Sequence, residues 1–219
     1  MMSSSFAMSI VAFVASTILV VCMVLADVKR IHDALPPVGM AVSIEDVRRR
    51  WSTGDILLFR SSNSSWISSS TVMQYTHIGI VVDGKVVEAH GKGDGRHLGN
   101  GASGVFAYDV EARVRTYPGT VHWSRLRAPR DQERDARIRR AVRRLAERNY
   151  DVDHVAWLVS SCSLRVPLVR PNDVVFCSEL VVDVLQRAGL VSSDIDASCV
   201  CPDDVAAMPL FDAPRPIFV

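Results

Sequence analysis

A predicted β-hairpin carries three side chains that could take part in proton transfer. Residues 76–82 and 85–90 are β-rich runs joined by Asp83-Gly84, a residue pair preferred in two-residue hairpin turns. Because side chains alternate along a strand, this pairing sends three polar side chains to one face of the sheet: His77, Glu88 and His90.

A histidine oriented by a carboxylate is the base half of a nucleophilic triad. The predicted register places His77 opposite His90 and Glu88 opposite Gly79, so Glu88 is a diagonal neighbour of His77 within side-chain reach. Either Glu88 or His90 could therefore orient His77. The residues alone are equally compatible with a partly exposed polar cluster that has no catalytic role.

Cys177 is the candidate nucleophile. It follows the apolar run 174–176 and opens a predicted helix over residues 176–188. Unpaired N–H groups and the helix dipole at this end favour a thiolate and could stabilise an oxyanion. The alternative is a buried structural cysteine. The other cysteines lie in less favourable settings: Cys22, Cys162, Cys199 and Cys201.

The elements around these residues predict an α+β domain with a small antiparallel sheet packed on helices. Ser43 is a predicted helix cap, and residues 56–59 form a predicted buried strand. Further strands are expected near residues 105–108, 112–116 and 121–126. Helices are expected over residues 131–148, 152–160 and 176–188, with a last short helix opening at residues 201–204.

An uncharged apolar run of 21 residues, Phe6–Ala26, precedes this domain. At about 1.5 Å per residue it could cross the roughly 30 Å core of a bilayer. We expect a transmembrane anchor, with a cleaved signal peptide as the alternative. Residues 27–42 are a predicted linker. Basic residues follow the apolar run and none precedes it, which favours a cytosolic domain on a single-pass membrane protein.

Composition excludes several classes of protein. The chain has 219 residues, 48% of them hydrophobic and 22% charged, which is incompatible with global disorder. A net charge of +1 gives no reason to expect nucleic acid as a partner. Five cysteines are too few for a disulfide scaffold, and no short metal-ligand or phosphate-loop spacing occurs. No cofactor or metal is therefore predicted.

Four short motifs, in order, resemble a known superfamily: Gly54-Asp55-Ile56-Leu57, Thr76-His77-Ile78-Gly79, Val86-Val87-Glu88-Ala89 and Phe176-Cys177-Ser178-Glu179-Leu180. The series resembles the circularly permuted NlpC/P60 (papain-like) superfamily, in particular YiiX/YaeF-like amidases and their poxvirus relatives. Lecithin:retinol acyltransferase-like proteins are more distant. In these families the histidine strand precedes the cysteine helix, the reverse of papain. Tyr150-Asp151 and the segment 201–204 also resemble family features. The resemblance covers residues 43–210.

The resemblance implies a permuted papain-like fold and a cysteine hydrolase of the amidase or peptidase kind. Cys177 would be the nucleophile, His77 its base and Glu88 the orienting residue, with His90 as the rival for that role. A thioester intermediate and an amide- or ester-containing substrate, peptide or lipid, follow from the same chemistry. The alternatives are a thiol-dependent lipid acyltransferase or phospholipase and an inactive membrane-tethered binding module.

Overall fold

The predicted hairpin is the centre of the fold. A computed structural model describes residues 38–62, 74–90, 104–129, 131–146, 149–150 and 174–219. Strands β3 (His77–Val82) and β4 (Lys85–His90) pair antiparallel, with Val82 opposite Lys85. Asp83 and Gly84 both have positive φ, 50° and 77°, as a tight turn of the primed type requires. The predicted strands, turn and register are confirmed.

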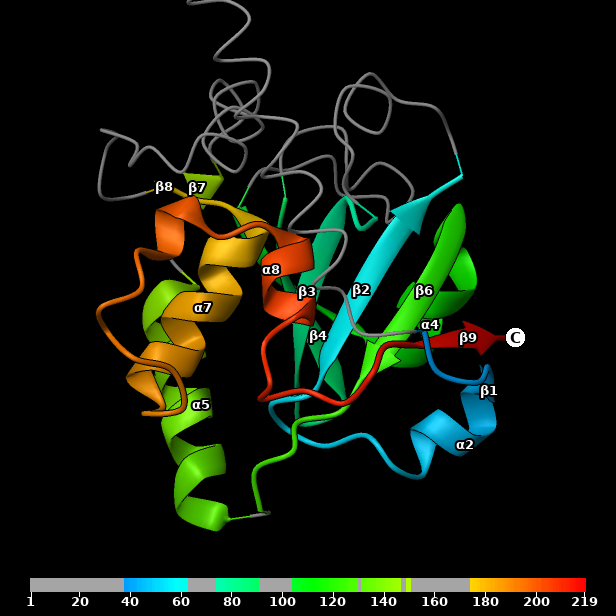
Figure 1. Ribbon diagram of the computed structural model, residues 1–219, viewed down its shortest axis with the longest axis horizontal. Coiled ribbons are helices and arrows are strands. Elements are labelled where there is room, and N and C mark those ends of the chain that lie inside the picture. The colour runs from blue at the N-terminus through cyan, green and yellow to red at the C-terminus, as the bar shows by residue number, and fades with distance from the viewer. Residues whose placement is uncertain (1–37, 63–73, 91–103, 130, 147–148, 151–173) are drawn as a thin grey trace, which may run out of the picture.

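The sheet is larger than predicted and is not purely antiparallel. Seven strands lie in the order β1-β9-β6-β2-β3-β4-β5, and the β1–β9 pair is parallel (Figure 1). The additional bounds are β1 (Val42–Ser43), β2 (Ile56–Ser61), β5 (Gly104–Asp109), β6 (Gly119–Ser124) and β9 (Arg215–Phe218). The expected α+β class is confirmed, but a small antiparallel sheet is wrong, because two short terminal segments add β1 and β9 to one edge. A separate pair joins β7 (Asn149–Tyr150) to β8 (Val174–Val175) in parallel.

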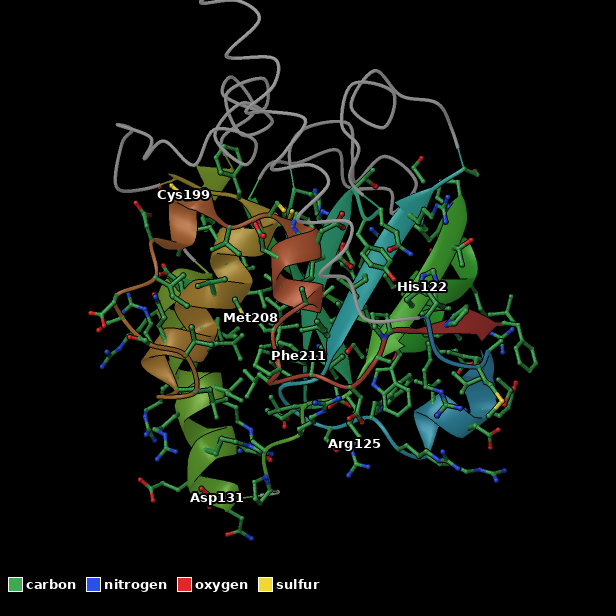
Figure 2. All side chains as sticks on the ribbon, viewed as in Figure 1. His122, Arg125, Asp131, Cys199, Met208 and Phe211 are labelled. Atoms are coloured by element: carbon green, nitrogen blue, oxygen red, sulfur yellow. The ribbon has the colours of Figure 1, made fainter. Side chains whose placement is uncertain are left out.

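Helices cover both faces of the sheet. Figure 1 shows α5 (Gln132–Leu145), α7 (Cys177–Arg187) and α8 (Pro202–Ala206) on one side. Their apolar residues join those of β2, β3 and β4 in one buried cluster. Phe211, labelled in Figure 2 in the segment after α8, is 3% exposed and belongs to the same cluster. A second cluster on the opposite face unites α2 (Ile44–Arg48) and α4 (Val110–Thr116) with the sheet.

Local sequence signals explain where the helices begin. The Ser43 side chain accepts a hydrogen bond from the Asp46 N–H at 3.1 Å and caps α2. Asp131, at the lower end of α5 in Figure 2, accepts hydrogen bonds from the next turn in the same way. The short helix predicted at residues 201–204 is also present, as α8.

The expected strand at residues 112–116 is wrong, because this segment belongs to α4. Asp109 caps the helix by accepting a hydrogen bond from the Ala112 N–H at 2.9 Å. The buried residues of α4 are Val110, Arg113 and Val114. Their spacing of three and four is helical, whereas a strand would bury every second residue.

Several predicted segments lie outside the described residues: the apolar run 6–26, most of the linker 27–42, the helix 152–160 and residue Asp151. Among the helices that the structure does describe, none is long and apolar enough to cross a membrane.

Candidate active site

His77 and Glu88 meet on one face of the hairpin. His77 Nε2 lies 2.8 Å from Glu88 Oε2, and the Glu88 side chain is fully buried. Extending the hairpin register places Glu88 opposite Gly79, two residues along β3 from His77. A Cβ atom at Gly79 would lie only 2.7 Å from Glu88 Cγ. Gly79 therefore leaves the space through which the carboxylate reaches diagonally to the imidazole.

Cys177 is the first residue of α7 and lies beside His77. Both β3 and α7 begin at the same end of the molecule, the upper end in Figure 1, and α7 packs on β3. The Cys177 side chain is 3% exposed and hydrogen-bonds to His77. Because Glu88 occupies Nε2, the ring nitrogen that remains for the thiol is Nδ1. The imidazole thus bridges the sulfur and the carboxylate.

The helix start also provides donors near the sulfur. The first N–H groups of a helix have no acceptor within that helix. Glu179 accepts a hydrogen bond from the Phe176 N–H at 3.1 Å, and Leu180 N–H is the first to bond back, to Phe176 O at 2.8 Å. The N–H groups between them, beginning with that of Cys177, point out of the end of α7. A carbonyl oxygen attacked by the sulfur would develop its charge there.

A buried arginine that sequence reasoning missed completes the cluster. Arg113 from α4 is 3% exposed and donates two hydrogen bonds to Glu88, Nε to Oε1 at 2.8 Å and Nη2 to Oε2 at 2.9 Å. Its guanidinium carbon lies 4.6 Å from the centroid of the Phe59 ring and 5.0 Å from that of Tyr117. The predicted strand at residues 112–116 gave no reason to pair this side chain with Glu88.

These contacts determine the charges in the cluster. Burial alone would lower the pKa of His77, but Cys177 and Glu88 outweigh it and raise the pKa from 6.5 to about 10. Burial alone would raise the pKa of Glu88, but hydrogen bonds and charge from His77 and Arg113 lower it from 4.5 to about 2. The arrangement therefore favours a protonated His77 beside an ionised Glu88.

His90, the predicted rival of Glu88, is held in a different environment. Its Nε2 lies 2.5 Å from the Tyr108 hydroxyl, and its ring stacks on Phe106 with centroids 4.7 Å apart. His90 shares the sheet face of His77 as predicted, but the partner of His77 Nε2 is Glu88. In the structure, Tyr108 is the partner of His90, and Glu88 is the partner of His77.

The segment that leads into β3 is anchored from α8. Asp203 is completely buried and accepts hydrogen bonds from the backbone N–H groups of Gln74 at 2.7 Å and Tyr75 at 2.9 Å. Tyr75 lies two residues before His77, so this carboxylate fixes the segment that leads into the His77 strand. The sequence predicts a short helix that opens at residues 201–204, but it does not predict this contact with the segment before β3.

Buried polar atoms without a hydrogen-bond partner lie close in sequence or space to these residues. Among the residues that the structure describes they are Tyr75 Oη, His122 Nδ1 and Ser178 Oγ. The Tyr75 and His122 rings meet edge to face with centroids 5.2 Å apart, and Figure 2 labels His122 on β6. Burial, together with the positive charge of Arg60, lowers the pKa of His122 to about 4. His122 is therefore a neutral ring at physiological pH.

The fold and the cluster define an α+β protein with a buried Cys-His-Glu constellation. No family model matches the sequence, and no curated protein matches it. Among solved structures, this chain is similar to the crystal structure of the metalloprotein YiiX from Escherichia coli O157:H7. The identity is 22%, and the match covers 63% of this chain and 66% of the YiiX chain, with a TM-score of 0.44. The chain therefore spans somewhat less than two thirds of the length of YiiX.

The description of YiiX as a metalloprotein concerns that protein. In the described part of this chain, no three side chains of His, Cys, Asp or Glu are grouped as metal ligands would be.

Proposed function

We propose that this protein is a cysteine hydrolase that cleaves amide bonds through a thioester intermediate. Cys177 is the nucleophile, His77 the general base and Glu88 the residue that orients His77. The observation that supports the proposal is that one imidazole, His77, interacts with the Cys177 thiol and holds its Nε2 2.8 Å from the Glu88 carboxylate. This is the geometry that nucleophilic catalysis by a thiol requires.

The reaction begins with transfer of the thiol proton to Nδ1 of His77, which leaves a thiolate beside an imidazolium. The sulfur attacks the substrate carbonyl carbon, and the carbonyl oxygen becomes an oxyanion held by the Cys177 N–H. The imidazolium then gives its proton to the leaving amine, the C–N bond breaks and a thioester remains. His77 next removes a proton from water, which attacks the thioester and releases the acid and the thiol.

The experiment that tests this proposal is the pH dependence of Cys177 alkylation by iodoacetamide in the full-length chain. Mass spectrometry follows the peptide that contains Cys177, so no other cysteine needs to be replaced. An ordinary thiol titrates near about 8.5. We expect Cys177 to react well below that pH, and His77→Ala to move its profile upward toward the ordinary value. Glu88→Gln should move it in the same direction by less.

Cys199 supplies an internal control, because it is a second cysteine outside any disulfide and lies in a separate short turn. Its alkylation profile should be the same in all three proteins. An ordinary profile for Cys177 that His77→Ala leaves unchanged would contradict the proposal.

The substrate follows from a second measurement. Acyl-peptide anilides test the amidase activity, and phospholipids test the alternative of thiol-dependent acyl transfer or lipid hydrolysis. Cys177→Ser and Cys177→Ala serve as inactive controls for both substrates. If phospholipids are turned over and acyl-peptide anilides are not, the same residues would act on esters instead of amides.

Attachment to a membrane through residues 6–26, with the catalytic domain on the cytosolic side, is a separate part of the proposal. The support for it is the 21-residue uncharged run and the basic residues that follow it. Extraction of membranes with alkaline carbonate tests the attachment, and protease protection of sealed vesicles tests the side. Release of the full-length chain by carbonate would contradict a spanning segment.

A further inference from the structure

Arg113 binds Glu88, the partner of His77, with two hydrogen bonds. Glu88 is buried on a sheet face. The guanidinium of Arg113 donates one hydrogen bond to each of its two carboxylate oxygens. Two parallel N–H donors fix the plane of a carboxylate as well as its charge. The lone pair of Oε2 that faces His77 is therefore aimed by the guanidinium.

The arginine is itself held in a fixed position. The rings of Phe59 and Tyr117 each lie within 5.0 Å of its guanidinium carbon, and they also contact each other at 4.9 Å between centroids. The Phe59 ring also lies 5.4 Å from the His77 ring. One aromatic side chain thus packs against both the base and the arginine, which couples their positions.

Burial gives the arginine an electrostatic task as well. A completely buried carboxylate with no cation beside it binds a proton, because desolvation disfavours its charged form. A protonated Glu88 would no longer attract the imidazolium that accepts the thiol proton. The titratable or charged groups that face Glu88 from the elements around it are His77 of β3, His90 of β4, Tyr108 of β5 and Arg113 of α4. Of these, Arg113 is the permanent cation.

We propose that Arg113 is a positioning residue that keeps Glu88 ionised and aimed at His77, and thereby sets the lowest pH at which Cys177 becomes reactive. The inference rests on the proposed function, since it concerns the same thiol. It adds a fourth member to the constellation, in which charge alternates from sulfur to imidazole, carboxylate and guanidinium.

A purely structural ion pair is the alternative, because buried ion pairs can be replaced by apolar residues without loss of stability. The two roles differ in how Arg113 and Glu88 combine. If Arg113 acts through Glu88, its removal has no further effect on Cys177 once Glu88 is neutral. If it only supports the fold, the two losses add.

The test uses alkylation profiles of Cys177 in the full-length chain for four variants: Arg113→Met, Arg113→Lys, Glu88→Gln and the double variant Arg113→Met/Glu88→Gln. We expect Arg113→Met to raise the pH at which Cys177 becomes reactive by about one unit or more. At a pH below this onset, alkylation should be about tenfold slower than in the wild type. Arg113→Lys keeps the charge without the fork and should recover part of the rate. The double variant should match Glu88→Gln.

Arg134→Met is the matched control. Arg134 is also 3% exposed and pairs with an acid, Asp135 at 2.7 Å, but it lies on α5 away from the cluster. It should lower the free energy of unfolding without moving the Cys177 profile. Circular dichroism checks that each variant is folded, and the neutral variant Arg113→Gln preserves the test if Arg113→Met is not folded.

Two failures are distinguishable. If wild-type Cys177 reacts below the pH of an ordinary thiol and responds to His77→Ala, but folded Arg113→Met or Arg113→Gln gives the wild-type profile, the role of Arg113 is overturned and the triad stands. A further loss in the double variant beyond Glu88→Gln overturns it in the same way. If wild-type Cys177 behaves as an ordinary thiol, the proposed function fails, and this inference fails with it.

Discussion

The Glu88 side chain reaches His77 through the space that a side chain at Gly79 would occupy. The hairpin register sets Glu88 opposite Gly79 and diagonal to His77, and the carboxylate oxygen still lies 2.8 Å from His77 Nε2. A Cβ atom at Gly79 would lie 2.7 Å from Glu88 Cγ and 2.5 Å from Val86 Cγ2. Residue 79 must therefore be a glycine, because any side chain there would occupy the space that the Glu88 side chain needs.

We expect Gly79→Ala to disturb the site as much as Glu88→Gln does. The added methyl group forces Glu88 or Val86 to move, and overpacking of a buried site costs about 1–3 kcal/mol. Displaced from His77, the carboxylate no longer stabilises the imidazolium. The alkylation profile of Cys177 should shift toward that of an ordinary thiol, and mass spectrometry of the Cys177 peptide measures the shift.

Gly189→Ala is the control for a general loss of stability. Gly189 has a φ of 73° with no atom within 4 Å of the added Cβ, so alanine brings backbone strain there without contact. It should lower the free energy of unfolding and leave the Cys177 profile unchanged. A wild-type profile in Gly79→Ala would show that Glu88 does not depend on this space.

The sequence predicts the parts of the site that short local signals encode. Asp83-Gly84 determines the hairpin turn and register, and alternation then places His77 and Glu88 on one face. The apolar run 174–176 and the helical pattern after it predict Cys177 at the first turn of a helix, and the structure has it as the first residue of α7. Contact between Cys177 and His77 required a family resemblance, because helix packing on a sheet is a long-range property that no local pattern encodes.

Other parts of the fold escaped prediction for physical reasons. The two-residue strand β1 and the four-residue strand β9 are too short for a period-two pattern, and they pair across nearly the whole chain. Helix α4 is a single segment of seven residues whose buried side includes Arg113. A charged residue at a core position hides the helical period, so the helix and its contact with Glu88 were missed together.

Ionisation of Glu88 should make the free energy of unfolding depend on pH in the acid range. Its pKa is lowered in the folded state, from 4.5 to about 2, against the burial that would raise it. The stabilisation is therefore fully present above about 4.5 and is lost as the pH falls toward about 2. Urea unfolding of the wild type and of Glu88→Gln should give free energies that converge over that interval.

Glu45→Gln is the comparison for this experiment, because Glu45 has a 64% exposed side chain at 3.5 Å from Arg115. Exposed pairs of this kind contribute about 0–1 kcal/mol, so its effect should be small at every pH. A constant difference between the wild type and Glu88→Gln from neutral to acid pH would show that Glu88 does not titrate differently in the folded and unfolded chains.

Asp203 should control both stability and reactivity from a distance in sequence of more than a hundred residues. Its carboxylate oxygens accept the N–H groups of Gln74 and Tyr75 at 2.7 and 2.9 Å. Asp203→Ala leaves both donors unpaired, and each buried unsatisfied group costs about 1–3 kcal/mol. Because Tyr75 leads directly into His77, the loosened segment should also slow alkylation of Cys177 below neutral pH.

Asp204→Ala separates the effect on stability from the effect on Cys177. Asp204 lies on the same helix, but it accepts a hydrogen bond from the Cys201 N–H at 3.1 Å and so caps α8. Its loss should cost about 1 kcal/mol and leave the Cys177 profile unchanged. Equal effects of the two variants on Cys177 would mean that α8 acts only as a structural support, and that Asp203 has no particular hold on the histidine strand.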